Sequence, residues 1–308
     1  MTIIEPVPYV TPERPRRRLA ARLGAALPKI VLAPSFAISL IFVYGFILWT
    51  VYLSFTRSRI LPIYDLVGFD AYYRLWSQPN WYMAIKNLAI FGVLYISLCI
   101  AIGLFIAILM DQRIRAEGVL RPIFLYPMAL SFVVTGTAWK WFLNPGLGLE
   151  KTMHNLGWES FKFDWLINTD MAIYTIVIAG VWQASGFIMA MFLAGLRGID
   201  GEIIKAAQID GAPTLAIYRR IIIPMLRPVF LSAVIVLAHM AIKSYDLVIA
   251  LTGGGPGNAT ELPSTFMYSY TFTRSQMAVG SASAVMMLMG ITAIIVPYLY
   301  SELREKRT

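Results

Sequence analysis

Six long apolar stretches alternate with polar segments along the chain. They are Ile30–Thr56, Met83–Met110, Pro122–Phe142, Met171–Leu196, Pro228–Leu251 and Met277–Tyr300. A helix needs about 20 apolar residues to cross the roughly 30 Å hydrocarbon core of a bilayer. The pattern therefore predicts an all-α membrane protein with six transmembrane helices. Pro127 and Gly136 interrupt the third stretch, which we keep as a span because neighbouring helices can satisfy the freed backbone groups.

Composition supports a membrane protein and argues against several kinds of site. Hydrophobic residues make up 58% of the chain, whereas soluble domains average about 45–50%. Charged residues make up 14%, whereas soluble domains average about 25%. The single cysteine, Cys99, cannot form an internal disulfide and lies in an apolar run. His154 and His239 are far apart in the sequence. We therefore predict neither a metal site nor catalytic residues.

The net charge of +9 is explained by membrane topology. If the N-terminus is cytoplasmic, eight basic residues lie outside or at the outer boundary. These are Arg57, Arg59, Arg74, Lys86, Lys140, Lys151, Lys162 and Arg274. Lys243 falls within the fifth span, and the remaining seventeen of the 26 lysines and arginines lie inside. Because basic loops stay in the cytoplasm, both termini are predicted to be cytoplasmic, and the charge does not require nucleic acid as a partner.

The spans divide the chain into a membrane domain and two tails. Residues 1–29 form a basic tail, which we expect to be disordered and cytoplasmic. The following apolar run is longer than the core of a cleavable signal, so we interpret it as an uncleaved first span. Residues 30–302 form the transmembrane domain, with a helical cytoplasmic loop at 197–227, and residues 303–308 form a second cytoplasmic tail. The outer loop between the third and fourth spans is expected to fold as a small cap.

The cytoplasmic loop between the fourth and fifth spans predicts two short helices. Asp200 is a good N-cap, and Glu202 suits the first helical turn. Gly211 is a natural helix stop, Pro213 can begin a second helix, and Pro224 is expected to end it. The first helix has only about ten residues and would be marginal alone, so it should dock on another surface. From these residues alone, a soluble partner and the membrane surface remain equally open.

The same loop resembles that of binding-protein-dependent ABC importer permeases, whose pattern is E-A-A-x3-G-x9-I-x-L-P. Ala206, Ala207, Gly211, Ile221 and Pro224 match this spacing. Lys205 stands where the family has Glu, and Ile223 stands where it has Leu. The resemblance implies contact with an ATPase through a coupling helix and the residues that follow it, and the ATPase-coupling residues would be Glu202, Lys205, Ala206, Ala207, Gly211 and Pro224. The reversed charge at Lys205 leaves the ion pairing at this joint open.

A second stretch, Tyr245–Gly257, is similar to the carbohydrate-uptake branch of these permeases. An aromatic–Asp pair there precedes an L-T-x-G-G-P-like sequence. The resemblance places a flexible turn, consisting of Gly253, Gly254, Gly255 and Pro256, near the outer gate and the binding protein. An ordinary turn is an equally good interpretation of these four residues.

The resemblance also implies an assembly and a location. This chain would pair with a second permease subunit, two ATPase subunits and an extracytoplasmic sugar-binding protein in a bacterial inner membrane. The sequence contains no G-x-x-x-x-G-K-[ST] loop, so ATP and magnesium would be bound by the ATPase partners. We therefore expect a transport subunit with no cofactor of its own, surrounded by lipid, that works by alternating access.

Polar residues inside the spans suggest a substrate pathway. Ser232, His239, Lys243 and Asp246 are spaced to form one stripe along the helix of the fifth span, and Lys243 can pair with Asp246. Trp182, Gln183, Tyr245 and Asp246 together offer aromatic faces and hydrogen-bonding groups of the kind that sugars need. The stripe could instead be structural. A rival function is an ion- or proton-coupled secondary transporter that uses Lys243 and Asp246, and it leaves the cytoplasmic helix unexplained.

Overall fold

The structure is a computed structural model that describes the backbone of residues 16–112 and 116–305. The chain divides into two compact units, residues 1–52 and 53–308. The first unit contains nearly all of α1 (Arg16–Leu53), of which Val31–Leu53 is apolar enough to cross a membrane. The helix begins within the predicted basic tail, so the tail from Arg16 onward is helical, contrary to expectation. Residues 1–15 and 306–308 lie outside the described part of the chain.

Three helices of the second unit confirm predicted spans. They are α3 (Pro79–Asp111), α7 (Ala172–Arg197) and α14 (Met277–Glu305), whose apolar stretch ends at Pro297. Within the described residues, these three and α1 are the helices long and apolar enough to span singly. The number rises to as many as six if each of two bent helix pairs counts as one span.

The third predicted span is one of these bent pairs. α4 (Glu117–Ala129) and α5 (Phe132–Phe142) meet at an angle of 98°. Pro127 lies inside α4, and the chain leaves the helix at Leu130, whose backbone is extended. The third predicted span is therefore a broken one, with the break close to Pro127, one of the two interruptions seen in the sequence.

A bend precedes the fifth predicted span, and a break lies within the span. The chain runs through α9 (Thr214–Ile217), the π-helix η1 (Tyr218–Ile222) and α10 (Ile223–Met225), then bends by 63° into α11 (Arg227–Ile242). Lys243 ends α11 with a non-helical backbone, and a new helix, α12 (Asp246–Leu251), begins three residues later. The helix predicted over Pro228–Leu251 is thus two helices.

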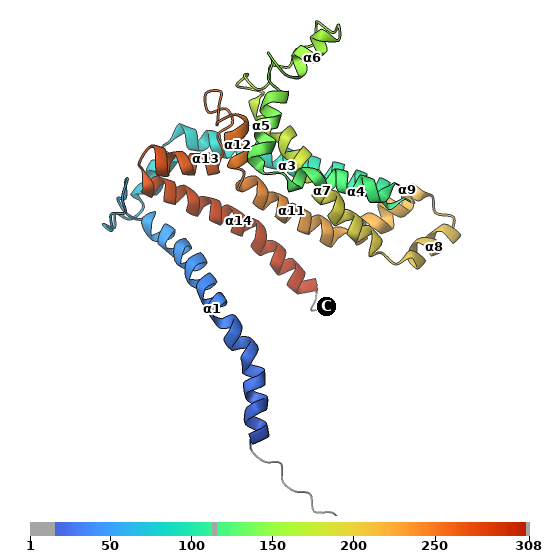
Figure 1. Ribbon diagram of the computed structural model, residues 1–308, viewed down its shortest axis with the longest axis horizontal. Helices are drawn as coiled ribbons and strands as arrows, with labels where there is room; N and C mark the ends of the chain where they lie inside the picture. Colours follow the sequence, from blue (N-terminus) through green and yellow to red (C-terminus); the bar gives the residue numbers. More distant parts are fainter. Residues whose placement is uncertain (1–15, 113–115, 306–308) are drawn as a thin grey trace, which may run out of the picture. The chain divides into compact units, whose positions relative to one another are not determined.

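The core of the second unit is centred on the packing of α3 against α7 (Figure 1). The buried face of α3 repeats every three or four residues, at Asn87, Phe91, Tyr95, Cys99, Gly103, Ala107 and Met110. This is the period that places side chains on one helix face. Gly103 brings the two backbones close, because a Cβ there would lie 2.7 Å from the Ile188 Cγ2 atom. Cys99 is buried in this row, where it packs as a small apolar side chain.

A smaller core joins the amphipathic α2 (Asp70–Trp76) to α13 (Pro263–Tyr268), the π-helix η2 (Ser269–Thr273) and the start of α14. The Phe266 and Tyr270 rings stack at 4.0 Å between centroids, and Trp81 packs on Phe266 at 5.1 Å. Aromatic pairs of this kind add about 0.5–1.5 kcal/mol beyond the area they bury.

The loop between α5 and α7, which we call the outer cap after the sequence prediction, contains local structure. It contains α6 (Leu149–Asn155), which lies beyond the end of α5 (Figure 1). The His154 Nε2 atom lies 2.7 Å from the Phe161 carbonyl oxygen, and the Phe163 N–H donates to the Glu150 carboxylate at 3.0 Å. His154 therefore has a structural role.

Candidate functional site

The loop between α7 and α9 contains α8 (Gly201–Ile209), a short helix with the boundaries that the sequence predicts. The Asp200 carboxylate accepts a hydrogen bond from the Glu202 N–H at 3.0 Å, so Asp200 is a true N-cap. Gly211 follows the helix with a φ of +78°, a conformation that glycine adopts without strain.

One face of α8 is left uncovered by the rest of the second unit. Ile204 and Ala207 pack partly against the core, and the helix as a whole buries no residue. Ala206 is exposed on the other side, as are Ile203 and Ile209, whose exposed fractions are 41% and 86%. Figure 1 shows α8 projecting at the end of the α7 and α9 region. A short helix with an outward apolar face is suited to docking on another protein.

Lys205 and Pro224 are two further residues of the predicted ATPase contact, and in the structure each interacts with its neighbours in the chain. The Lys205 ammonium lies 2.8 Å from the Glu202 carboxylate, an exposed pair within α8. Pro224 lies in the first turn of α10, where the missing N–H is tolerated. The helical path ends at Leu226, two residues later, so the prediction that Pro224 itself ends the helix is wrong.

An ion-pair cluster near this loop was not predicted. The Arg197 guanidinium, at the end of α7, lies 2.8 Å from Glu117 at the start of α4 and 3.8 Å from Asp111 at the end of α3. It joins three helix ends three residues before the Asp200 cap. Only folding brings these residues together, since they are about 80 positions apart in the chain.

Trp182 and Gln183 lie next to each other on α7 but face different surroundings. The Trp182 side chain is 41% exposed and its ring packs edge-on against Trp139, with 5.8 Å between centroids. Gln183 is buried, and its Nε2 atom donates to the Leu130 carbonyl oxygen at 2.9 Å. That carbonyl lies at the break between α4 and α5. Gln183 therefore stabilises a broken helix, and the expectation that it contacts sugar directly does not fit its burial.

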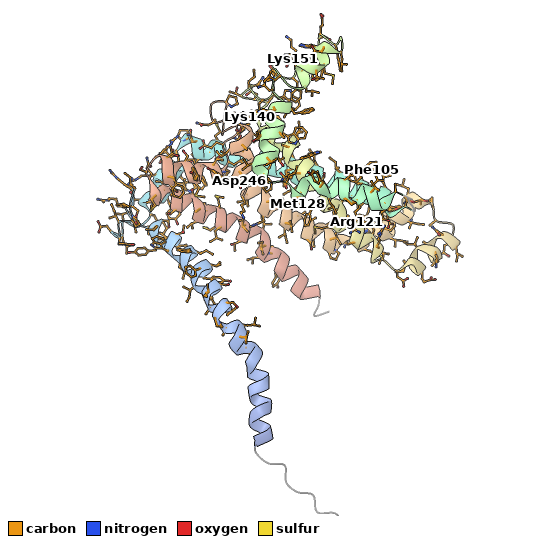
Figure 2. All side chains as sticks on the ribbon, viewed as in Figure 1. Phe105, Arg121, Met128, Lys140, Lys151 and Asp246 are labelled. Atoms are coloured by element: carbon orange, nitrogen blue, oxygen red, sulfur yellow. The ribbon has the colours of Figure 1, made fainter. Side chains whose placement is uncertain are left out.

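The polar stripe predicted for the fifth span does not exist as one helical face. His239 and Lys243 are exposed near the end of α11, whereas Asp246 is exposed at the start of α12. Figure 2 shows Asp246 at the junction of these helices. The ion pairs found among the described residues do not include Lys243 with Asp246. The break supplies the reason, because residues three apart lie together only along a continuous helix.

Tyr245 lies inside the break and belongs to an aromatic row. Its ring packs on Tyr268 at 4.9 Å, and Tyr268 packs on Phe272 at 5.0 Å. Tyr268 and Phe272 are 43% and 65% exposed. With Lys243 and Asp246 beside it, the break presents charged and aromatic groups together on an open surface, which is the combination that sugar recognition uses.

The glycine-rich turn after α12 contains several hydrogen bonds, and its predicted flexibility stays a prediction. Gly253 and Gly254 have φ values of 66° and 89°, and the Gly255–Pro256 peptide is cis. The Thr260 hydroxyl lies 2.7 Å from the Thr252 hydroxyl and donates to the Gly255 carbonyl at 2.9 Å. These hydrogen bonds link the two ends of the turn.

Asn87 of α3 fixes the end of this turn, next to a buried acid that sequence reasoning missed. Its Nδ2 atom donates to the carbonyl oxygens of Ala259 and Glu261, both at 3.0 Å. Burial raises the pKa of the Glu261 carboxyl to about 7, although Arg274 opposes this effect. Glu261 Oε2 is buried without a hydrogen-bond partner in the described part of the chain. Glu261 comes directly before an apolar segment, and no spacing in the sequence marks it as buried.

Comparison with known proteins agrees with this arrangement. Residues 99–308 match the family described as binding-protein-dependent transport system inner membrane component. A probable ABC transporter permease protein of Pyrococcus horikoshii is 38% identical over 283 residues, which cover 91% of this chain and 97% of the relative. A xylose/arabinose import permease protein of Haloferax volcanii is 34% identical over 274 residues, which cover 88% of this chain and 86% of the relative.

The fold is similar to that of a solved transporter. A chain of a bacterial ABC transporter involved in the import of the acidic polysaccharide alginate superposes with a TM-score of 0.78 at 18% identity. The match covers 94% of this chain and 99% of that one. The family match, the two relatives and the broken-helix fold together show that this chain belongs to the binding-protein-dependent inner membrane components, the membrane-spanning permease subunits of ABC importers.

Proposed function

We propose that this permease imports a sugar and forms half of the translocation pathway. The observation that carries the proposal is the 34% identity to a xylose/arabinose import permease over 88% of the chain. A trehalose/maltose transport permease of Thermococcus litoralis is 30% identical over 89% of the chain. Hydroxyl-rich substrates also suit the charged and aromatic surface at the α11–α12 break.

The sugar would pass along the side of the protein that carries the break. Trp182, Lys243, Tyr245 and Asp246 are at least partly exposed there or nearby, and His239 lies one turn before Lys243. We assign these five residues to the pathway and leave Gln183 out, because it is buried and bonded to Leu130. The hydrogen-bonded turn of Gly253, Gly254, Gly255 and Pro256 would form part of the outer entrance.

ATP-driven coupling would occur at α8. Its outward face carries Ile203, Ala206 and Ile209, and the Gly211 stop keeps the helix short. Arg197, a few residues before α8, links the end of α7 to the end of α3 and the start of α4. A displacement of α8 would therefore be transmitted to these three helices. Alternating access then follows if the two ATPases move α8 when they close.

The assembly we infer contains a second permease subunit, two ATPases that bind ATP and magnesium, and an extracytoplasmic sugar-binding protein. It would lie in a bacterial inner membrane, surrounded by lipid, with both termini of this chain in the cytoplasm. A secondary transporter that uses Lys243 and Asp246 is not favoured, because the family is ATP-driven and the two residues form no ion pair.

Replacement of one exposed residue tests the coupling. Ile209→Asp should leave the fold unchanged because the side chain is 86% exposed, yet it should abolish co-purification of the ATPase and uptake of labelled sugar. Leu156→Asp, at a residue 76% exposed in the outer cap, is the matched control for ATPase binding. Normal ATPase binding and uptake by Ile209→Asp would remove α8 from the proposal.

A further inference from the structure

A cavity of about 520 Å³ lies in the second unit, away from the α11–α12 break. It is formed by the segment after Leu53, by α2, by Gln78 and by the beginning of α14. Its lining includes Arg57, Arg59, Asp70, Arg74, Gln78 and Arg274. Neither the coupling nor the transport proposed above uses these residues.

The cavity is strongly basic. Four arginines line it, and the one acidic residue in the lining, Asp70, pairs with Arg74. Arg57, Arg59 and Arg274 take part in no ion pair found among the described residues. Guanidinium groups bind phosphate through paired hydrogen bonds, so three arginines that make no ion pair around one cavity favour an anion with several oxygens.

Hydrogen bonds hold the parts of the cavity in place. The Met277 and Ala278 N–H groups, at the start of α14, donate to the carbonyls of Arg59 and Ser58 at 3.2 and 3.0 Å. The Arg274 guanidinium donates to the Tyr270 hydroxyl at 2.9 Å, and that hydroxyl donates to the Gln78 Oε1 atom at 2.9 Å. The Arg274 side chain also lies over the Tyr270 ring, 4.5 Å from its centroid. The Arg274 guanidinium, which comes from the segment just before α14, is therefore held in position by Tyr270.

An exposed apolar loop adjoins the arginines. Ile60, Leu61 and Leu66 are 71%, 73% and 65% exposed, and Ile63 is 40% exposed. The Ser58 hydroxyl donates to the Ile63 carbonyl and accepts from the Ile63 N–H, both at 3.0 Å, which fixes the loop. Clustered apolar side chains beside cations are typical of segments that enter the boundary between headgroups and acyl chains.

The cavity also lies at the ends of membrane-crossing helices. The apolar stretch of α14 begins at Met277, beside the lining residue Gln276, and α3 begins at Pro79, beside Gln78. In the orientation predicted above, this is the outer surface of the membrane, where basic residues are otherwise disfavoured. Four of the eight basic residues predicted on that side line this one cavity.

We propose that this cavity binds the phosphate group of an anionic phospholipid from the outer leaflet. Arg57, Arg59 and Arg274 would hold the phosphate, while Ile60, Leu61, Ile63 and Leu66 lie among the acyl chains. A free phosphate has the same headgroup chemistry but gives no role to the apolar loop, which is why a lipid is favoured. The proposal does not depend on which substrate is imported.

Binding can be measured on the purified transporter, with its partner subunits, in lipid nanodiscs. One set of nanodiscs contains phosphatidylcholine alone, and the other contains a mixture of phosphatidylcholine and phosphatidylglycerol. Native mass spectrometry then counts the lipid molecules that stay bound to the transporter. The triple variant Arg57→Gln, Arg59→Gln, Arg274→Gln should show roughly a hundredfold weaker preference for phosphatidylglycerol, since each cation near a membrane surface contributes about 1 kcal/mol. The matched control removes three basic charges away from the cavity, Lys140→Gln at the end of α5 and Lys151→Gln and Lys162→Gln in the outer cap, and should retain the preference. Two of these lysines, Lys140 and Lys151, are labelled in Figure 2.

The outcomes separate the possible ligands. Selective retention of phosphatidylglycerol by wild type and control, lost in the triple variant, supports the proposal. Equal retention of both lipids by wild type, or equal loss in the control, overturns it. Displacement of phosphatidylglycerol by millimolar inorganic phosphate would also overturn the lipid assignment and identify a free-anion site instead. If the triple variant fails to insert, Arg274→Lys serves as a second variant, because it keeps the charge but not the paired geometry and should weaken retention partially.

Discussion

The Gln183 side chain ties α7 to the point where α4 ends. Its Nε2 atom bonds to the Leu130 carbonyl, while its Oε1 atom is buried without a partner in the described part of the chain. A lipid-embedded protein has little water to satisfy such a carbonyl, so this donor stabilises the break directly.

Replacement of Gln183 should affect stability more than sugar recognition. Gln183→Met removes the donor and should lower stability by about 1 kcal/mol, since it also removes an unsatisfied oxygen. Gln183→Glu should be worse, because a carboxylate would face the Leu130 carbonyl in a buried place. Thermal unfolding of the purified permease and the KM for uptake are the two measurements. An altered KM with unchanged stability in Gln183→Met would return this residue to the sugar pathway.

Glu261 gives the outer turn a pH dependence. Burial raises the pKa of this carboxyl to about 7 in the folded state, above its ordinary value of 4.5. Between these two pH values the folded protein binds more protons than the unfolded chain, so stability should fall as pH rises through that window and level off above about pH 7. Glu261→Gln cannot ionise and should flatten the profile of melting temperature between about pH 5 and 7.

The exposed acid Glu159 in the outer cap is the control for this measurement. Glu159→Gln should leave the pH profile as it is in the wild type. A wild-type profile that is already flat across the window would show that Glu261 is ionised in the folded protein.

At the scale of elements, small residues decide how closely the broken α4–α5 pair approaches its neighbours. A Cβ on Gly186 would lie 1.7 Å from the Phe124 carbonyl oxygen, so α4 crosses α7 with its backbone against a glycine. A Cβ on Gly136 would lie 2.6 Å from the Ala250 Cβ atom, where α5 meets α12. Close crossings of this kind are typical of membrane helices.

The crossing at Gly186 can be tested with one methyl group. Gly186→Ala should destabilise the permease by about 2 kcal/mol or more, because backbone rather than a flexible side chain must move. Gly92→Ala is the matched control, since no atom lies within 4 Å of a Cβ at that helical glycine. Thermal unfolding and the yield of inserted protein are compared. Equal stability of the two variants would show that α4 does not lie against α7 as described.

At the scale of the whole molecule, the outer cap and α8 should lie on opposite sides of the membrane. Leu156→Cys and Ile209→Cys place single thiols at residues 76% and 86% exposed, and the native Cys99 is buried and should not react. An impermeant maleimide should label Leu156→Cys in intact spheroplasts and Ile209→Cys only after the membrane is opened. The reverse pattern would invert the topology inferred from basic residues.

The sequence by itself determined the class of the protein, most of its spans and its family. Uninterrupted apolar runs predicted α3, α7 and α14, because a bilayer imposes a minimum length that composition alone reveals. The Asp200 cap and the Gly211 stop predicted α8, because capping depends on a few neighbouring residues. The spacing from Ala206 to Pro224 carried the family resemblance for the same reason: it is local.

Only the tertiary structure decided where the long helices break and which polar groups then meet. Apolar composition is the same for a straight span and a bent pair, so Pro127 indicated an interruption but not the 98° bend after Ala129, and the end of α11 at Lys243 was not predicted. The roles of Gln183 and Arg197, and the basic cavity, depend on contacts between segments 50 or more residues apart. Packing fixes such contacts, and no local pattern in the sequence reports them.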